Sequence, residues 1–140
     1  MLSPTKLRKL KAALTKAHPR TQFQFDWVLR AAFSNADVDA LLGRAQFVPG
    51  KGARLKRMGR SLCHDNAATL AIKHRGWKWF YGVALSPDGC WRVHSWALTT
   101  RGRIVETTVP RKVYWGLDAR ETGSQLLKEP ARVTAVGRLA

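Results

Sequence analysis

The sequence changes character at Gly76. Before this residue apolar side chains recur at helical spacing, whereas after it runs of aromatic and β-branched residues alternate with short turn signals. The runs cover residues 77–85, 91–98 and 103–109, which predicts a three-stranded antiparallel meander, and a fourth strand is expected over 112–117. Helices followed by a meander are typical of an α+β fold.

Three helices are expected before residue 44. Ser3-Pro4 suits the start of the first helix, leucines then recur at helical spacing, and His18-Pro19 ends it. Similar signals predict a second helix over residues 25–33 and a third over 34–43. The first helix is rich in lysine and arginine on its polar side.

Residues 44–60 show no periodicity and contain proline and several glycines, which predicts a loop. Five cations of this loop are candidates for binding a polyanion: Lys51, Arg54, Lys56, Arg57 and Arg60. The whole chain has 25 Lys and Arg against 9 Asp and Glu, a formal net charge of +16. A field of this sign attracts nucleic acid, acidic protein surfaces or anionic lipid. A solvated loop is the alternative interpretation.

With 140 residues the chain is long enough for one domain with a single core. We expect a helical and basic-loop region over 1–60, a core helix with the sheet over 61–117, and a tail over 118–140 with a weak helix around 124–128. No window reaches the roughly 20 apolar residues of a membrane span, and the N-terminus lacks an apolar run of secretory type. A cytoplasmic protein with two free thiols is therefore expected.

Cys63 is the candidate nucleophile. A helix is predicted over residues 61–75, with Ser61 as its N-cap, which puts Cys63 in the first turn. The unpaired N–H groups and the dipole of a helix start favour an anion, and so does the neighbouring Arg60. A nucleophilic thiolate needs this kind of environment.

A thiolate that attacks an acyl carbon also needs a base, and the base needs an acceptor that fixes its tautomer. His94 in the second strand of the meander is the candidate base, and Glu106 in the third strand is the candidate acceptor. A turn centred on Arg101 would pair His94 with Thr108 and make Glu106 its diagonal neighbour on the same face. A turn centred half a residue away would put the two side chains on opposite faces.

These stretches resemble the transglutaminase-like branch of the papain-like fold. The chain is also similar to a group of bacterial and phage proteins with a C-x-x-N-A helix start, an H-x-W strand, a G-x-[VI]-[VI]-[DE]-x-T strand and a later Y-[FW]-G. The matching residues here are 63–67, 94–96, 102–108 and 114–116. The resemblance covers about residues 62–117, and residues 1–60 resemble no family that we can name.

The resemblance implies a cysteine-dependent hydrolase or acyltransferase with a Cys63-His94-Glu106 triad and a papain-like scaffold. It implies peptide or isopeptide hydrolysis, glutamine deamidation or transamidation. We expect a protein or peptide substrate, no cofactor and no metal. Glu106 stands where the transglutaminase-like pattern more often has Asp.

Three further residues are candidates for supporting the site. Asn66 lies one turn after Cys63 and either bonds the loop before the helix or lines the site. Trp96 shares a strand face with His94, and either shields the imidazole or fills the core. Tyr114 either aims its hydroxyl at the site or packs. For an oxyanion hole the candidates are the backbone N–H of Cys63 and the side chains of Gln22, Gln24 and Gln46.

Two other interpretations remain open. One is a zinc site built from some of the five residues Cys63, His64, His74, Cys90 and His94, although none of them pairs at a familiar ligand spacing. The other is a non-enzymatic module that binds nucleic acid through the first helix and the basic loop, which the charge favours and no recognised nucleic-acid-binding motif supports.

Overall fold

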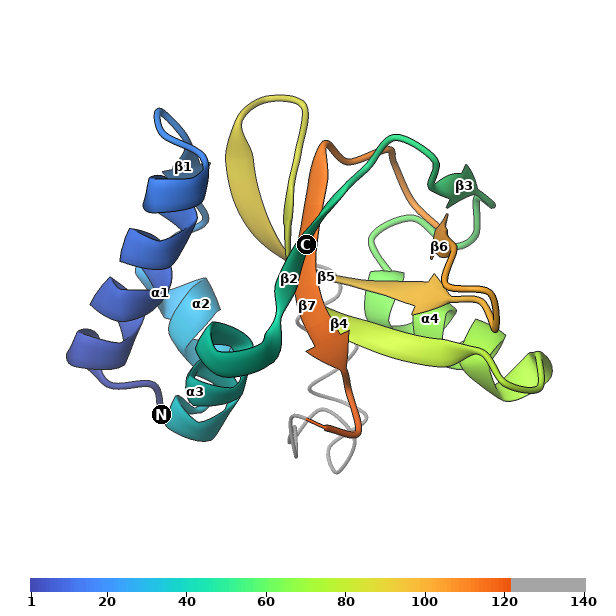
Figure 1. Cartoon of the computed structure of the whole chain (residues 1–140), viewed down its shortest axis with the longest axis horizontal. Helices are drawn as coiled ribbons and strands as arrows, with labels where there is room; N and C mark the ends of the chain where they lie inside the picture. Colours follow the sequence, from blue (N-terminus) through green and yellow to red (C-terminus); the bar gives the residue numbers. More distant parts are fainter. Residues whose placement is uncertain (122–140) are drawn as a thin grey trace.

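The computed structural model describes residues 1–121 and combines four helices with one mixed sheet (Figure 1). The helices are α1 (Pro4–Ala17), α2 (Asp26–Ala32), α3 (Asn35–Arg44) and α4 (Cys63–Lys73). The strands are β1 (Gln22–Phe23), β2 (Gln46–Pro49), β3 (Arg54–Leu55), β4 (Lys78–Leu85), β5 (Cys90–Leu98), β6 (Ile104–Glu106) and β7 (Val113–Asp118). The α+β expectation is confirmed.

The N-terminal helices begin where the sequence places them. The Ser3 hydroxyl accepts a hydrogen bond from the backbone N–H of Lys6, with Pro4 in the first turn of α1. Ser34 and Asp37 form a reciprocal capping box at the start of α3. Such caps satisfy N–H groups that a helix start leaves without partners.

The predicted meander is the centre of the sheet. β4 and β5 pair antiparallel along their whole length, and β6 pairs antiparallel with the end of β5. Ala97 lies opposite Val105 and Leu98 opposite Ile104, which is the register of a turn centred on Arg101. β7 returns to pair with β4, and the strand order is β2-β7-β4-β5-β6-β3, with β1 beside β5.

The second edge of β5 is shared by two short strands. β4 takes one edge completely, so β6 at residues 97–98 and β1 at residues 90–91 must both lie on the other edge. His94 falls between these two pairings, opposite Gly82 of β4. Among the described residues no strand pairs with that edge beside His94.

The helices bury different parts of the sheet. Leucines of α1 and apolar residues of α2 and α3 pack with Tyr81, Val83, Trp91 and Trp115 in the largest core cluster. α4 packs against β4 and β5, where Leu70 meets Ala97 and Val105. Figure 1 shows α1, α2 and α3 grouped at the left of the sheet and α4 at its right. No helix within residues 1–121 has the length and apolarity that a bilayer crossing requires.

Two sequence predictions need correction. The segment 44–60 is not only loop, because it contributes β2 to the edge beside β7 and β3 to the edge beside β6. Ser61 does not cap α4: its φ is +58°, and the residue at the N-cap is Leu62, which makes no side-chain capping bond. The weak helix expected around residues 124–128 lies outside the described residues.

Candidate active site

Cys63 is the first residue of α4 and is 2% exposed. The chain approaches it through Ser61 in the left-handed region, and Asn66 fixes this approach by donating its Nδ2–H to the carbonyl of Gly59 at 2.8 Å. Asn66 thus bonds the loop before the helix. The thiol lies at a cavity of about 120 Å³ lined by Arg60, Ser61, Cys63, Thr108, Val109 and Arg111.

His94 is fully buried and is oriented by Glu106. The ring Nε2 lies 2.7 Å from Glu106 Oε1, a distance typical of a charge-assisted hydrogen bond. The other ring nitrogen, Nδ1, makes no hydrogen bond of standard geometry with any described residue. The Cys63 thiol is nevertheless close enough to the ring to contribute, after Glu106, to a pKa of His94 above its ordinary value. The structure therefore brings together the three residues that the sequence proposed as a triad.

The Glu106 carboxylate is held from several directions. Besides His94, Oε1 accepts a hydrogen bond from the Tyr114 hydroxyl at 2.8 Å. Oε2 accepts from the backbone N–H and the hydroxyl of Thr108, both at 3.0 Å. The Arg111 guanidinium is 4.0 Å from Oε1. These donors favour the ionised carboxylate and fix its orientation.

Opposing effects set the charges of this pair. Burial pulls the pKa of His94 downward, but the Glu106 carboxylate and the Cys63 thiol outweigh it, so the pKa lies above its ordinary value of 6.5. Burial also pushes the pKa of Glu106 upward, and His94, Thr108 and Tyr114 together lower it to about 2. Both shifts favour an imidazolium beside a carboxylate.

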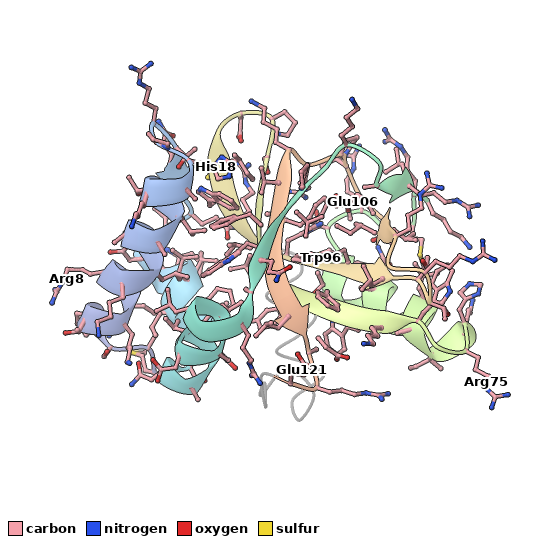
Figure 2. The ribbon with its side chains drawn as sticks, viewed as in Figure 1. Arg8, His18, Arg75, Trp96, Glu106 and Glu121 are labelled. Atoms are coloured by element: carbon pink, nitrogen blue, oxygen red, sulfur yellow. The ribbon has the colours of Figure 1, made fainter. Side chains whose placement is uncertain are left out.

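The aromatic rings of Trp96 and Tyr114 form a wall behind His94 and Glu106. Trp96 and Glu106 are labelled in Figure 2. The Trp96 ring stacks near His94, with 6.0 Å between centroids, and meets the Tyr114 ring edge-on at 4.9 Å. Burial and the Glu106 charge raise the pKa of Tyr114, so its hydroxyl remains a donor. Trp96 thus both covers the imidazole and fills a core position, and Tyr114 aims its hydroxyl at the site.

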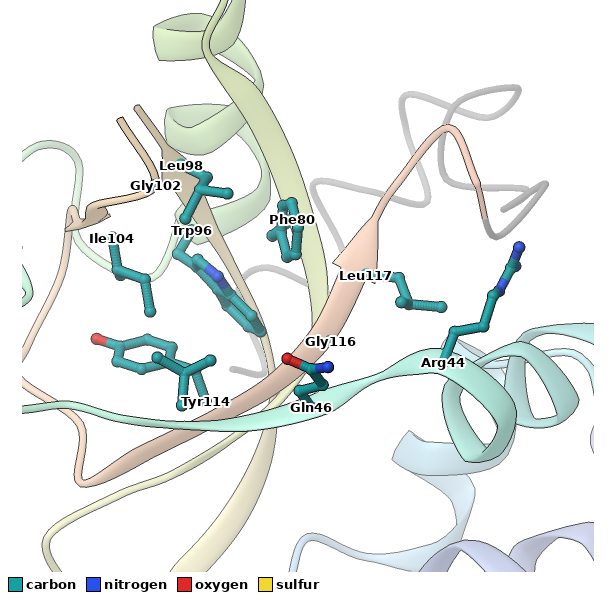
Figure 3. A pocket seen from close by; sticks show the side chains of 11 residues that line it. Arg44, Gln46, Phe80, Trp96, Leu98, Gly102, Ile104, Tyr114, Gly116 and Leu117 are labelled. Carbon is teal, nitrogen blue, oxygen red and sulfur yellow. The ribbon is translucent and has the colours of Figure 1, made fainter. Parts of the chain in front are cut away.

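A pair of glycines makes room for this wall. Gly116 and Gly82 lie opposite each other on β7 and β4. A Cβ atom on Gly116 would come within 2.6 Å of the Trp96 ring, and one on Gly82 within 2.3 Å of the Trp115 carbonyl oxygen. Real Cβ atoms do not approach so closely, so the position of Trp96 depends on Gly116. Figure 3 shows Trp96, Tyr114 and Gly116 around a second cavity of about 320 Å³.

The predicted oxyanion glutamines do not lie at the Cys63 cavity. Gln46 lines the second cavity, and Gln24 accepts the backbone N–H of Val93 through Oε1 at 2.7 Å. Gln22 is an exposed residue of β1. The backbone N–H of Cys63 is the remaining candidate from the sequence.

The five cations predicted to bind a polyanion are all exposed, and one of them, Arg60, also lines the Cys63 cavity.

Cys90 lies on β5 as a half-buried thiol whose pKa is raised by burial. Within residues 1–121 no group of three or more His, Cys, Asp or Glu side chains is arranged to hold a metal ion.

Sequence reasoning missed Arg111 and Thr108 as parts of the site. Thr108 was expected only as the strand partner of His94, and it is instead a double donor to Glu106. Arg111 is 8% exposed, although arginine is rarely buried unless it is paired. The only signal in the sequence was their position two and five residues after the acid.

Comparisons of the chain with models of protein families, with curated proteins and with solved structures found no match.

Proposed function

We propose that the protein is a cysteine-dependent acyl-transfer enzyme of transglutaminase-like, papain-like type, with Cys63 as nucleophile, His94 as base and Glu106 as the residue that orients the base. One observation carries the proposal. The imidazole of His94 is bound on one nitrogen by a buried carboxylate, and the ring interacts with a thiol at the start of a helix. Nucleophile, base and orienter in this order are the parts that thiol acyl transfer requires.

In the proposed reaction, the Cys63 proton first passes to His94, which gives a thiolate beside an imidazolium, and Sγ then attacks the carbonyl carbon of an amide. The tetrahedral oxyanion is stabilised by N–H groups at the start of α4, including that of Cys63. When the C–N bond breaks, His94 returns the proton to the departing amine and a thioester remains on Cys63. Water or an amine then attacks the thioester and gives a proton to His94, and the C–S bond breaks to release the acid or the new amide and return Cys63 as the thiolate.

Glu106 does not take a proton in this cycle. Its pKa of about 2 keeps it ionised, so it holds the ring orientation and stabilises the imidazolium. The carboxylate is engaged by His94, Tyr114 and Thr108, which leaves it poorly suited to act as a base itself.

Alkylation of the two cysteines tests this proposal within one molecule. Cys63 should react with iodoacetamide at pH 6 at least about tenfold faster than Cys90, because the imidazolium stabilises its thiolate whereas burial raises the pKa of Cys90. His94→Ala should remove most of this advantage, and Glu106→Gln should remove less. Mass spectrometry of the two cysteine peptides over a pH series gives both rates.

Equal and slow labelling of Cys63 and Cys90 in the folded protein, unchanged by His94→Ala, would contradict the proposal and leave Cys63 as a core residue. Glu106→Gln should change the rate of Cys63 while leaving that of Cys90 alone. A parallel change at both cysteines would indicate general loosening of the fold.

A second candidate function, polyanion binding, is favoured by an arrangement that the sequence does not reveal. The turn between β5 and β6 brings Arg101 and Arg103 to the same open cavity, about 280 Å³, as Lys51. Within the described part of the chain none of these three cations is in an ion pair. Binding of heparin or mixed RNA should weaken steeply as sodium chloride rises, and affinity that stays flat would exclude this role.

A further inference from the structure

The cavity beside Cys63 is lined by positive charge. Of its six lining residues two are arginines, Arg60 and Arg111, and none is acidic. Glu106, the acid of the proposed triad, is 1% exposed. Its carboxylate oxygens accept hydrogen bonds from His94, Tyr114 and Thr108. Its charge is balanced within the protein by His94 and in part by Arg111, whose Nε lies 4.0 Å from Oε1, so the wall of the cavity itself carries two cations and no anion.

The Arg111 guanidinium is fixed in place. Nη1 donates to the Ser86 hydroxyl at 2.7 Å, Nε donates to the Val109 carbonyl at 3.3 Å, and Nη2 donates to the Thr108 hydroxyl at 3.4 Å. A guanidinium has five N–H groups, so these bonds leave two that are not used within residues 1–121. A buried, pre-oriented guanidinium with spare donors is well suited to hold a planar anion.

Arg60 contributes differently, because it is exposed at the rim of the same cavity. Asp65 is half-buried in the first turn of α4, and it does not line the cavity. A ligand that enters beside Cys63 thus passes one exposed cation and meets one fixed cation. At about 120 Å³ the cavity suits a small group such as a carboxylate better than a bulky one.

We propose that this cavity is a subsite for a carboxylate carried by the acyl substrate close to the bond that Cys63 attacks, with Arg111 as the fixed partner and Arg60 as the rim partner. The inference rests on the proposed function and narrows its substrate class to acidic acyl groups. It also gives the buried Arg111 a role in binding substrate besides its contact with Glu106.

Iodoacetate and iodoacetamide test the subsite because both alkylate a thiol by displacing iodide and only iodoacetate carries a carboxylate. The measured quantity is the rate with iodoacetate divided by the rate with iodoacetamide, determined for Cys63 and Cys90 in the same sample. This ratio should be about tenfold higher for Cys63, the effect of one charge-assisted hydrogen bond. Cys90 controls for the general attraction of anions to the chain.

Matched variants locate the effect. Arg60→Gln should lower the Cys63 ratio about threefold. The effect is smaller than that of Arg111 because Arg60 is exposed, so water and salt screen its charge. Arg57→Gln removes the same charge from an exposed residue that does not line the cavity, and it should leave the ratio unchanged. Arg111→Gln should bring the ratio close to that of Cys90, and Arg111→Lys should retain part of it. Thermal unfolding of each variant shows whether the fold is kept.

The outcomes separate the two proposals. A Cys63 that reacts quickly with iodoacetamide but has the ratio of Cys90 would overturn the carboxylate subsite and leave the proposed function standing. Slow labelling by both reagents, insensitive to His94→Ala, would overturn both. If Arg111 served only as an oxyanion donor, Arg111→Gln would leave the ratio unchanged, because alkylation forms no tetrahedral oxyanion, and the subsite would again be overturned.

Discussion

His64 and His94 are both fully buried beside Cys63, yet their pKa values move in opposite directions. Burial, and to a lesser extent the neighbouring His94, lowers the pKa of His64 from 6.5 to about 3, whereas the pKa of His94 lies above its ordinary value. His64 follows Cys63 in the sequence, and His94 is 31 residues further along the chain than Cys63. Proximity in sequence therefore does not identify the base.

The partners of the two rings explain the difference. His64 Nδ1 meets the hydroxyl of Ser95, and its Nε2 has no hydrogen-bond partner among the described residues. The Ser95 hydroxyl also accepts the Trp79 Nε1–H at 3.0 Å, and all these groups are neutral. His94 has the Glu106 carboxylate instead. A buried imidazole stays neutral unless a charged partner offsets its desolvation, so the acid decides which histidine can serve as the base.

Removing the acid should make His94 resemble His64. In Glu106→Ala, burial would act on His94 without its main counter-charge, so the pKa of His94 should fall below 6.5. The free energy of unfolding should drop by about 3–5 kcal/mol, since breaking a buried ion pair leaves its partner without compensation. NMR titration of the imidazole C–H resonances and urea unfolding measure the two effects.

Asp88 provides the control, because it is a carboxylate paired with Arg92 at 2.8 Å on the surface. Asp88→Ala should leave the pKa of His94 unchanged and alter stability far less, as expected for a solvated pair. A pKa of His94 that stays above 6.5 in Glu106→Ala would show that Glu106 is not the residue that distinguishes the two histidines.

A substitution beside Trp96 should affect His94 and not His64. Gly116→Ala would place a methyl group within 2.6 Å of both the Trp96 ring and the Tyr81 carbonyl oxygen, and Trp96 stacks near His94. Overpacking of this kind costs about 1–3 kcal/mol, and it should shift the His94 resonances while leaving those of His64 in place. Urea unfolding and two-dimensional NMR measure these effects.

Gly43 is the matched control. It lies in α3, and no atom lies within 4 Å of the place that an alanine methyl group would take, so Gly43→Ala should stabilise the protein by about 0.5–1 kcal/mol through helix propensity. Equal effects of the two alanines would mean that Trp96 moves aside without cost and that Gly116 has no special role.

The sequence predicts the starts of α1 and α3 and the central register because these depend on local chemistry. A serine cap followed by proline begins α1, and the turn at Arg101 sets the pairing of β5 with β6. The same register places Glu106 where it can meet His94. These features need only a few neighbouring residues to be specified.

Other features depend on distant parts of the chain and leave weak local signals. All four residues of β2 are exposed, so no inside–outside alternation marks it as a strand, and β3 has only two residues. Arg111 carries no sign of burial in its own segment, because its partner Ser86 lies 25 residues earlier in the chain. The cationic character of the Cys63 cavity becomes visible only when these segments come together.

The last comparison of the two histidines concerns the pH dependence of stability. The folded-state pKa of His64 is about 3 and its ordinary value is 6.5, so between these values the unfolded chain binds a proton that the folded protein does not. His64 therefore makes stability rise with pH across this window, by up to about 1.4 kcal/mol per pH unit. His94 has the opposite sign: its stabilisation is fully present below 6.5 and is lost as pH rises through its raised pKa.

His64→Asn separates the two contributions, because the amide can still meet Ser95 but does not titrate. Wild type and variant share the His94 contribution, so it cancels when their unfolding free energies are subtracted. The difference, measured by urea unfolding from pH 4 to 8, should rise with pH up to about 6.5 and stay flat above it, because only the wild type gains stability as the unfolded His64 loses its proton. Parallel curves between pH 4 and 6 would mean that His64 titrates alike in both states. Burial would then not keep His64 neutral in the folded protein. The difference between the pKa values of His64 and His94 would need a cause other than the Glu106 carboxylate.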